Sequence, residues 1–237
     1  MILDRRNLEI DYHGPMCGRF ALIVDASVLA DVFEVEVPQE IKPRFNIAPT
    51  QTAPIVRRGN QGNRELASAR WGLVPSWSKD EKIGARMINA RGETVAEKPS
   101  FRSAVKTRRC LVPASGFYEW VRTGETKQPH FIHFSDGRTF AFAGLWERWH
   151  KGDGDPLDTF TIITTTPNEL MQELHDRMPV ILPPDRYAEW VHPDPLHPNR
   201  LQELLAPCSV EGMEEYPVST YVNRPTNDGA ECIAPLA

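Results

Sequence analysis

A cysteine near the start of the chain has the most distinctive chemistry in the sequence. Cys17 follows Met16 and precedes Gly18, Arg19 and Phe20, a pentapeptide that has the form of a protein's first residues although it starts at position 16. Removal of everything before Cys17 would leave a free α-amine beside its thiol. Such a 1,2-aminothiol condenses with an aldehyde to a Schiff base, and its thiol then closes a thiazolidine ring. The alternative is that Cys17 is a small buried hydrophobic residue.

Two further segments carry polar groups that a purely structural chain would not need. Asn89 and Arg91 are two residues apart, so an extended segment would place both on one face. Glu119 lies among the aromatic residues of segment 117–120, where partial burial would raise its pKa towards neutrality and suit it to proton transfer. The structural alternatives are a turn for Asn89 and an ion pair for Glu119.

A third segment brings an imidazole next to two charged groups. His175 is followed directly by Asp176 and Arg177. Histidine is the side chain whose ordinary pKa suits proton transfer near neutral pH. The pattern favours an acid/base role, and the alternative is a buried structural histidine.

Composition restricts the class of protein. The chain has 237 residues, 41% of them hydrophobic and 25% charged, which is typical of a single globular domain. No apolar run reaches the roughly 20 residues of a membrane span, and residues 1–15 lack the apolar core of a signal peptide, so we expect a cytoplasmic protein. The four cysteines are widely spaced with no C-x-x-C pair. We therefore expect free thiols, no metal and no cofactor.

Charge is distributed unevenly along the chain. The formal net charge is −5, yet residues 70–110 contain ten Lys or Arg against four Asp or Glu, and residues 185–237 contain three against nine. Arginine also outnumbers lysine, twenty to seven, and arginine is the better bidentate ligand of phosphate. Segment 70–110 is thus a candidate nucleic-acid surface, and the alternative is an ordinary solvated face.

The hydrophobic pattern predicts short strands in the middle of the chain and helices mainly towards its end. We expect a helix over 26–35 beginning after Asp25, a proline-rich loop over 43–54, and a hairpin of strands 54–58 and 64–71. Further strands are predicted over 110–112, 117–121, 130–134, 139–146 and 159–165, and helices over 167–174, 184–191 and 199–205. Without a βαβ rhythm, this predicts one α+β domain with a strongly bent, barrel-like antiparallel sheet flanked by helices, and we expect a monomer.

Several strings resemble the signature blocks of the SOS response-associated peptidase (SRAP) family. They are MCGRF, RFNIAPTQ, RWGLVPSW, INARGETVAEKPSF, RRCLVPASGFYEW and LHDRMPVIL, in the family's order. The resemblance runs from Met16 to about Leu182. It implies the SRAP fold over residues 16–237, preceded by an N-terminal extension or propeptide over residues 1–15. Bacterial and animal members of the family act as abasic-site sensors on DNA, so the expected partner is single-stranded DNA that contains abasic sites.

The resemblance also implies roles for individual residues. Cys17 matches the cysteine that captures the sugar aldehyde of an abasic site as a thiazolidine, and Asn89 matches an asparagine close to the reacting sugar carbon. Glu119 matches the acid/base of ring opening and crosslink reversal, and His175 a histidine that assists proton transfer. Residues matching the DNA cleft are Arg19, Arg91 and Arg177, and less specifically Pro49, Trp71, Trp77 and Thr164.

This chain departs from the family pattern at its start. Family members carry the cysteine directly after the initiator Met, whereas sixteen residues precede Cys17. An amide-bonded Cys17 cannot form a thiazolidine, so we expect either translation from Met16, which we favour, or autoproteolytic release of the leader. Three alternative activities remain at this point: a thiol peptidase using Cys17, His175 and Glu119, a non-covalent reader of modified or single-stranded DNA, and a β-eliminating lyase.

Overall fold

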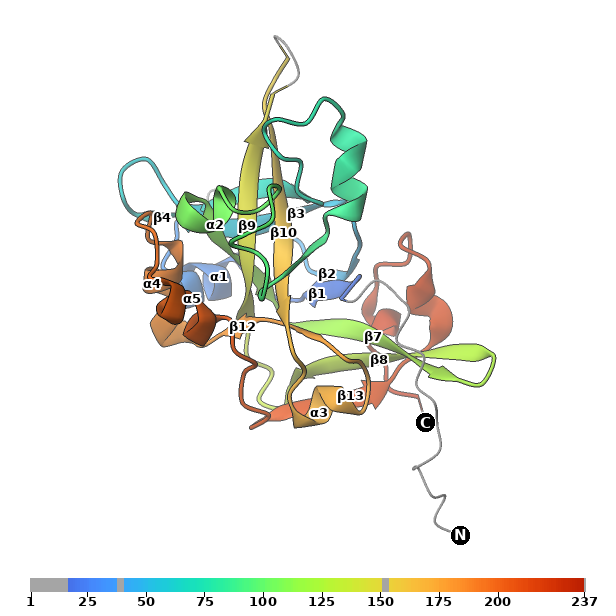
Figure 1. Ribbon diagram of the computed structural model, residues 1–237. Helices are drawn as coiled ribbons and strands as arrows, with labels where there is room; N and C mark the ends of the chain where they lie inside the picture. Colours follow the sequence, from blue (N-terminus) through green and yellow to red (C-terminus); the bar gives the residue numbers. More distant parts are fainter. Residues whose placement is uncertain (1–16, 38–40, 151–153, 237) are drawn as a thin grey trace.

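A closed barrel of five strands forms the centre of the protein (Figure 1). The computed structural model describes residues 17–37, 41–150 and 154–236. Around the barrel the strands follow the order β4 (Arg64–Trp71), β3 (Thr52–Arg58), β6 (Arg109–Ala114), β9 (Phe140–Trp149) and β10 (Leu157–Thr165), and β10 returns to β4. Four pairings are antiparallel, and β10 pairs with β4 in parallel. The predicted barrel-like sheet is confirmed, with one parallel pairing added to it.

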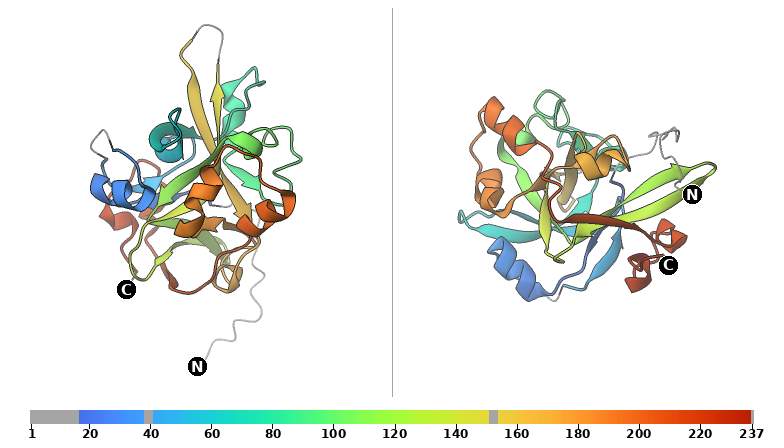
Figure 2. Two further views of the ribbon diagram at one scale, coloured as in Figure 1. Left: turned by 90° about the vertical axis from the view of Figure 1, so that its left-hand side faces the viewer. Right: turned by 90° about the horizontal axis from the view of Figure 1, so that it is seen from below.

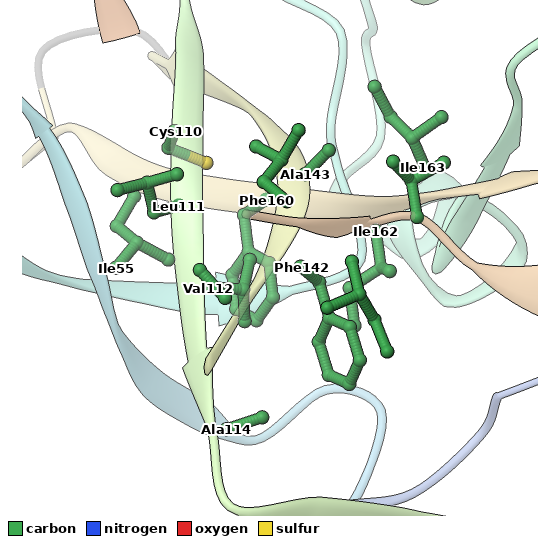
Figure 3. Close-up of a cluster of buried hydrophobic side chains, with 14 of the residues drawn as sticks. Ile55, Cys110, Leu111, Val112, Ala114, Phe142, Ala143, Phe160, Ile162 and Ile163 are labelled. Carbon is green, nitrogen blue, oxygen red and sulfur yellow. The ribbon is translucent and has the colours of Figure 1, made fainter. Parts of the chain in front are cut away.

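Aliphatic and aromatic side chains fill the barrel (Figure 3). Strand β6 is buried along its whole length, and β9 and β10 are buried nearly throughout. These strands are buried on both faces because helices, loops or the second sheet cover the barrel's outer face, and β10 accordingly buries threonines as well as aliphatic and aromatic residues. Phe142, Phe160 and Ile162 have no exposed surface. The barrel is therefore a packed core that holds its strand ends in fixed positions.

A second, five-stranded antiparallel sheet packs against one end of the barrel. Its order is β13 (Met213–Pro217), β8 (Thr126–Phe134), β7 (Gly116–Thr123), β1 (Phe20–Leu22) and β2 (Arg44–Ile47). Only Ser115 separates β6 from β7, so the chain passes from the barrel into the second sheet at this point. Strand β1, which begins three residues after Cys17, and strand β7, which contains Glu119, both belong to this sheet.

Short helices lie on the outside of the barrel (Figure 2). They are α1 (Ala26–Phe33), α2 (Ala104–Thr107), α3 (Glu169–Gln172), α4 (Tyr187–Val191) and α5 (Pro198–Leu204), with 3-10 turns η2 (Glu81–Arg86), η3 (Pro184–Arg186), η4 (Thr220–Asn223) and η5 (Ala230–Cys232). Buried Arg109 fastens the α4 region to the barrel by donating to the carbonyls of Trp190, His192 and Asp194, and the Trp190 indole donates to the carbonyl of Cys110. Arg109 is therefore a structural residue of segment 70–110.

The predicted hairpin, the later strands and all four predicted helical segments are found, with shifted ends. The expected loop over 43–54 is wrong, because β2 and the first residues of β3 fall within it. The carboxylate of Asp228 accepts hydrogen bonds from the backbone N–H groups of Phe45 and Asn46. The backbone of edge strand β2 is thus hydrogen-bonded to a residue more than 180 positions away, and the local sequence does not reveal this contact. Strands β1, β5 (Asn89–Arg91), β11 (Met178–Pro179), β12 (Ile181–Leu182) and β13, and helix α2, were also not predicted.

The close packing of Gly116, where the chain passes from the barrel into the second sheet, can be tested by substitution. A Cβ at Gly116 would lie 2.2 Å from Cζ of Phe131 and 2.8 Å from the carbonyl oxygen of Ile132. We expect Gly116→Ala to lower the free energy of unfolding by about 1–3 kcal/mol, measured by urea denaturation. Gly124→Asn is the control, because no atom lies within 4 Å of that position and Asn tolerates its φ of 65°. Equal stability of the Gly116 variant and the wild type would contradict the packing described here.

Candidate functional site

Strand pairing places Cys17 directly against Glu119. Strand β1 pairs antiparallel with β7, with Phe20 opposite Phe117. Cys17 lies three residues before β1, so in this register it comes beside the middle of β7. The backbone nitrogen of Cys17 donates to Oε1 of Glu119 at 2.7 Å. Both residues are buried, with exposures of 0% and 3%.

Burial dominates the protonation of this pair. It raises the pKa of the Glu119 carboxyl to about 8, against the opposing effect of hydrogen bonds from the backbone N–H groups of Cys17 and Trp120. Burial also raises the pKa of the Cys17 thiol well above its ordinary value, and the negative charge of Glu119 adds to this effect. At neutral pH, Glu119 is consequently a mostly protonated carboxylic acid beside a thiol.

The backbone of Cys17 has a φ of 41°. This left-handed region is uncommon for residues with a Cβ and costs a non-glycine residue on the order of 1 kcal/mol. The residue with the strained backbone, Cys17, is thus the one that contacts the buried carboxyl of Glu119.

A second group of predicted residues meets at the end of strand β10. Strand β5 pairs in parallel with β10, which places Asn89 opposite Ile162 and Arg91 opposite Thr164. Strand β11 pairs with the same end of β10 from the other side. Segment 175–177 directly precedes β11, so it arrives at this point as well.

Arg177 is held firmly within the protein. Its Nη1 and Nη2 donate to the two carboxylate oxygens of Glu93 at 2.6 and 2.9 Å. Nη2 also donates to the carbonyl oxygen of Thr164 at 2.7 Å and to its hydroxyl at 3.2 Å. This guanidinium lowers the pKa of Glu93, mainly through the hydrogen bonds. Arg177 therefore ties the turn after β5 to the end of β10.

His175 is buried, with 7% exposure, and burial lowers its pKa. Its Nδ1 lies 2.8 Å from Oδ1 of Asp176 and 3.1 Å from the backbone nitrogen of Arg177. The charge of Asp176 also raises the pKa of Glu119. Segment 175–177 and the Cys17–Glu119 pair therefore share one electrostatic environment.

The structure changes the interpretation of three predicted DNA-contacting residues. Trp71 is completely buried and its indole donates to the carbonyl of Ile88, so the prediction that it stacks on bases is wrong. Thr164 is 1% exposed and contacts Arg177, so it offers no surface to DNA either. Arg19 donates to the side chain of Asn46 and to backbone carbonyls of the segment 222–223.

The remaining predicted contacts lie nearer the surface. Trp77 is 60% exposed, Arg91 is exposed, and Pro49 is half-buried. The Trp149 indole donates to the carbonyl of Ser78, which places the Trp77 loop near the start of β10, whereas Arg91 lies near its end. The chain from Trp77 to Arg91 thus follows β10, and it carries exposed cationic side chains at Lys79, Lys82, Arg86 and Arg91.

Glu93 and Asp176 are site residues that sequence reasoning did not single out. Glu93 was visible within INARGETV and Asp176 within LHDRMPVIL. The sequence does not show that Glu93 binds Arg177, because these two residues are 84 positions apart.

Within residues 17–37, 41–150 and 154–236, no three His, Cys, Asp or Glu side chains gather as metal ligands would. None of the helices in these ranges has the length and apolar character required to cross a membrane.

Comparison with known sequences gives a consistent result. The sequence model of the family described as SOS response associated peptidase (SRAP) matches residues 16–225. The abasic site processing protein YoqW of Bacillus subtilis is 47% identical over 222 residues, which cover 92% of this chain and 99% of that protein. The abasic site processing protein HMCES of Gallus gallus is 34% identical, over 82% of this chain and 67% of that protein.

Solved structures share the same architecture. A protein from Bacteroides thetaiotaomicron superposes with a TM-score of 0.84 at 27% identity, over 93% of this chain and all of that chain. A phage-related protein from Bordetella bronchiseptica gives a TM-score of 0.67 at 31% identity, over 85% of this chain and 94% of that chain.

The raised pKa of Glu119 predicts a pH-dependent penalty on stability. Between the ordinary carboxyl pKa and about 8 the unfolded chain has lost this proton while the folded chain keeps it, so stability falls as pH rises through this window. We expect Glu119→Gln to raise the free energy of unfolding by about 1–3 kcal/mol at pH 8 and by little at pH 5. Urea denaturation at both pH values measures this, and a pH-independent difference would contradict the buried-acid assignment.

Proposed function

Since the chain belongs to the SOS response associated peptidase (SRAP) family, we propose that it captures abasic sites in single-stranded DNA as a covalent thiazolidine on Cys17. The observation that carries this proposal is the 2.7 Å contact between the backbone nitrogen of Cys17 and Glu119. In the reactive form that nitrogen is an α-amine, so the contact places an acid/base group on the atom that must attack the aldehyde.

Ring opening comes first, because an abasic sugar exists mainly as a closed hemiacetal. One group must accept the proton of the sugar hydroxyl, and another must donate a proton to the ring oxygen. Neutral His175 suits the first role and protonated Glu119 the second, given the directions of their pKa shifts. Asn89, on β5 beside the end of β10, is the proposed hydrogen-bonding partner of the sugar.

Capture then forms two bonds to the former aldehyde carbon. The amine of Cys17 adds to the carbonyl, and loss of the oxygen as water gives an imine. The thiol of Cys17 adds to the imine carbon, and its proton ends on the nitrogen. The net change is the sum of protein and DNA minus one water. Glu119 accepts the amine proton and returns a proton to the leaving hydroxyl, since it lies against this nitrogen.

The proposal requires that the residues before Cys17 be absent from the reactive protein. Residues 1–15 then form an extension or propeptide, and the SRAP domain covers 16–237. Translation from Met16 followed by Met removal achieves this, as does autoproteolytic release, in which Cys17 is the reacting residue. Loss of the preceding carbonyl would also remove the constraint that defines the positive φ at Cys17, which relieves the strain there.

Of the three alternative activities left open by the sequence, two assign Cys17 a different role or none. A thiol peptidase acting in trans would use Cys17 as nucleophile, but burial holds the pKa of this thiol high and disfavours the thiolate that such an enzyme needs. A non-covalent reader of DNA would use the surface from Trp77 to Arg91 without any role for Cys17. The fate of the Cys17→Ala variant separates these from covalent capture.

The first test is intact mass spectrometry with a single-stranded oligonucleotide carrying one abasic site. Protein beginning at Cys17 should form a heat-stable adduct with the mass of protein plus DNA minus water. Both Cys17→Ala and protein that retains residues 1–16 should form no such adduct, while still binding DNA. An undiminished adduct in either control would contradict capture by an aminothiol at Cys17.

The DNA surface is tested at Trp77. Base stacking on an aromatic side chain contributes about 1–3 kcal/mol, so we expect Trp77→Ala to weaken binding of single-stranded DNA about tenfold. Trp77→Phe should retain most of the affinity, and Val28→Ala, on exposed α1, serves as the control. Fluorescence anisotropy at one fixed salt concentration measures these affinities. Equal affinity of Trp77→Ala and the wild type would remove Trp77 from the interface.

A further inference from the structure

The carboxylate of Glu93 covers the hydrogen-bonding edge of Arg177. Its two oxygens accept hydrogen bonds from Nη1 and Nη2 of this arginine. A guanidinium offers the same paired geometry to a carboxylate and to a phosphate. The pairing lowers the pKa of Glu93, so the carboxylate is ionised at neutral pH. A phosphate that approaches Arg177 therefore finds its binding edge already occupied by a negative charge.

Glu93 lies at the end of the cationic path that runs from Trp77 to Arg91. It follows Arg91 by two residues, and the charge of Arg91 adds to the effect of Arg177 in lowering the Glu93 pKa. The path itself is the surface proposed above for single-stranded DNA. An ionised carboxylate thus interacts with two arginines at the point where this path reaches the end of β10.

The two partners of the ion pair differ in their access to solvent. The side chain of Glu93 is 48% exposed, whereas that of Arg177 is 11% exposed. Nη2 of Arg177 also donates to the carbonyl and hydroxyl oxygens of Thr164, and the backbone N–H of Gly92 donates to the same carbonyl. Arg177 and the backbone beside Glu93 therefore keep these contacts when the Glu93 side chain turns towards solvent.

We propose that the Glu93 carboxylate occupies a phosphate-binding edge of Arg177 in the free protein, and that a phosphodiester of single-stranded DNA displaces it on binding. The choice of DNA as the ligand rests on the function proposed above. Breaking the ion pair then opposes the binding of every strand. Glu93 in this way limits the affinity for undamaged DNA, whereas a strand captured at Cys17 is retained by a covalent bond.

The first measurement is the affinity of the full chain for an undamaged oligodeoxythymidylate, by fluorescence anisotropy at one fixed salt concentration. Glu93→Gln retains the shape of the side chain but loses its charge, so we expect binding to tighten about three- to tenfold. Glu97→Gln is the control, because it removes an exposed negative charge from the same segment after β5 and should change the affinity less than about twofold. Unchanged or weaker binding by Glu93→Gln, or no binding by the wild type, would overturn the inference.

A double variant tests whether Glu93 acts through Arg177. Arg177→Gln should weaken binding and reduce the slope of log affinity against log salt concentration by about 0.7, the value for one phosphate contact on a single strand. In this background, Glu93→Gln should change the affinity no more than Glu97→Gln does. Equal tightening with and without Arg177 would indicate a general effect of charge and would overturn displacement from this arginine.

The wild type supplies a direct measurement of the displacement. The carboxyl ¹³C signal of Glu93, assigned by its loss in Glu93→Gln, reports the pKa of this group. We expect the pKa to rise on saturation with oligodeoxythymidylate, because the carboxylate loses Arg177 and gains phosphates as neighbours. A pKa that stays low in the complex would overturn the inference. Absence of an adduct with abasic DNA would instead refute capture at Cys17, because none of these three measurements involves an abasic site.

Discussion

The contact between the backbone nitrogen of Cys17 and the carboxyl of Glu119 is the constraint on which the rest of the site depends. The contact exists because β1 and β7 pair with Phe20 opposite Phe117, so the chain that precedes Phe20 runs beside the residues that follow Phe117. Phe20 of β1 and Phe117 of β7 both pack edge-on against Phe142 of the barrel strand β9, which holds this register. The packed interior of the barrel therefore positions the Cys17–Glu119 pair at its edge.

Burial gives this contact its chemical character. Glu119 is removed from water and keeps its proton to about pH 8, and the thiol of Cys17 is likewise held in its neutral form. The proposed ring opening requires a proton donor near pH 7, and a carboxylic acid that stays protonated would supply one. Asp176 lies at the surface, and its negative charge favours the protonated forms of both Glu119 and His175 by raising their pKa values.

The arginines of the site separate into two kinds. Arg177 and Arg19 are engaged by carboxylate, amide or carbonyl oxygens within the protein, so they fix the segments that bear His175 and Cys17. Arg91 remains exposed beside the end of β10, at the end of a cationic path that begins near Trp77. The resemblance to the family had grouped all three arginines together as residues of the DNA cleft.

The sequence by itself determined the five strands of the barrel, four of the helical segments around it and the chemical groups of the site, because hydrophobic periodicity and residue type are local properties. Only the tertiary structure decided that Cys17 meets Glu119 across 102 positions, that Arg177 is held by Glu93, and that Trp71 lies inside the core. The physical reason is that strand register and burial arise from the packing of the whole chain, whereas a local pattern contains no information about which distant residue will face it.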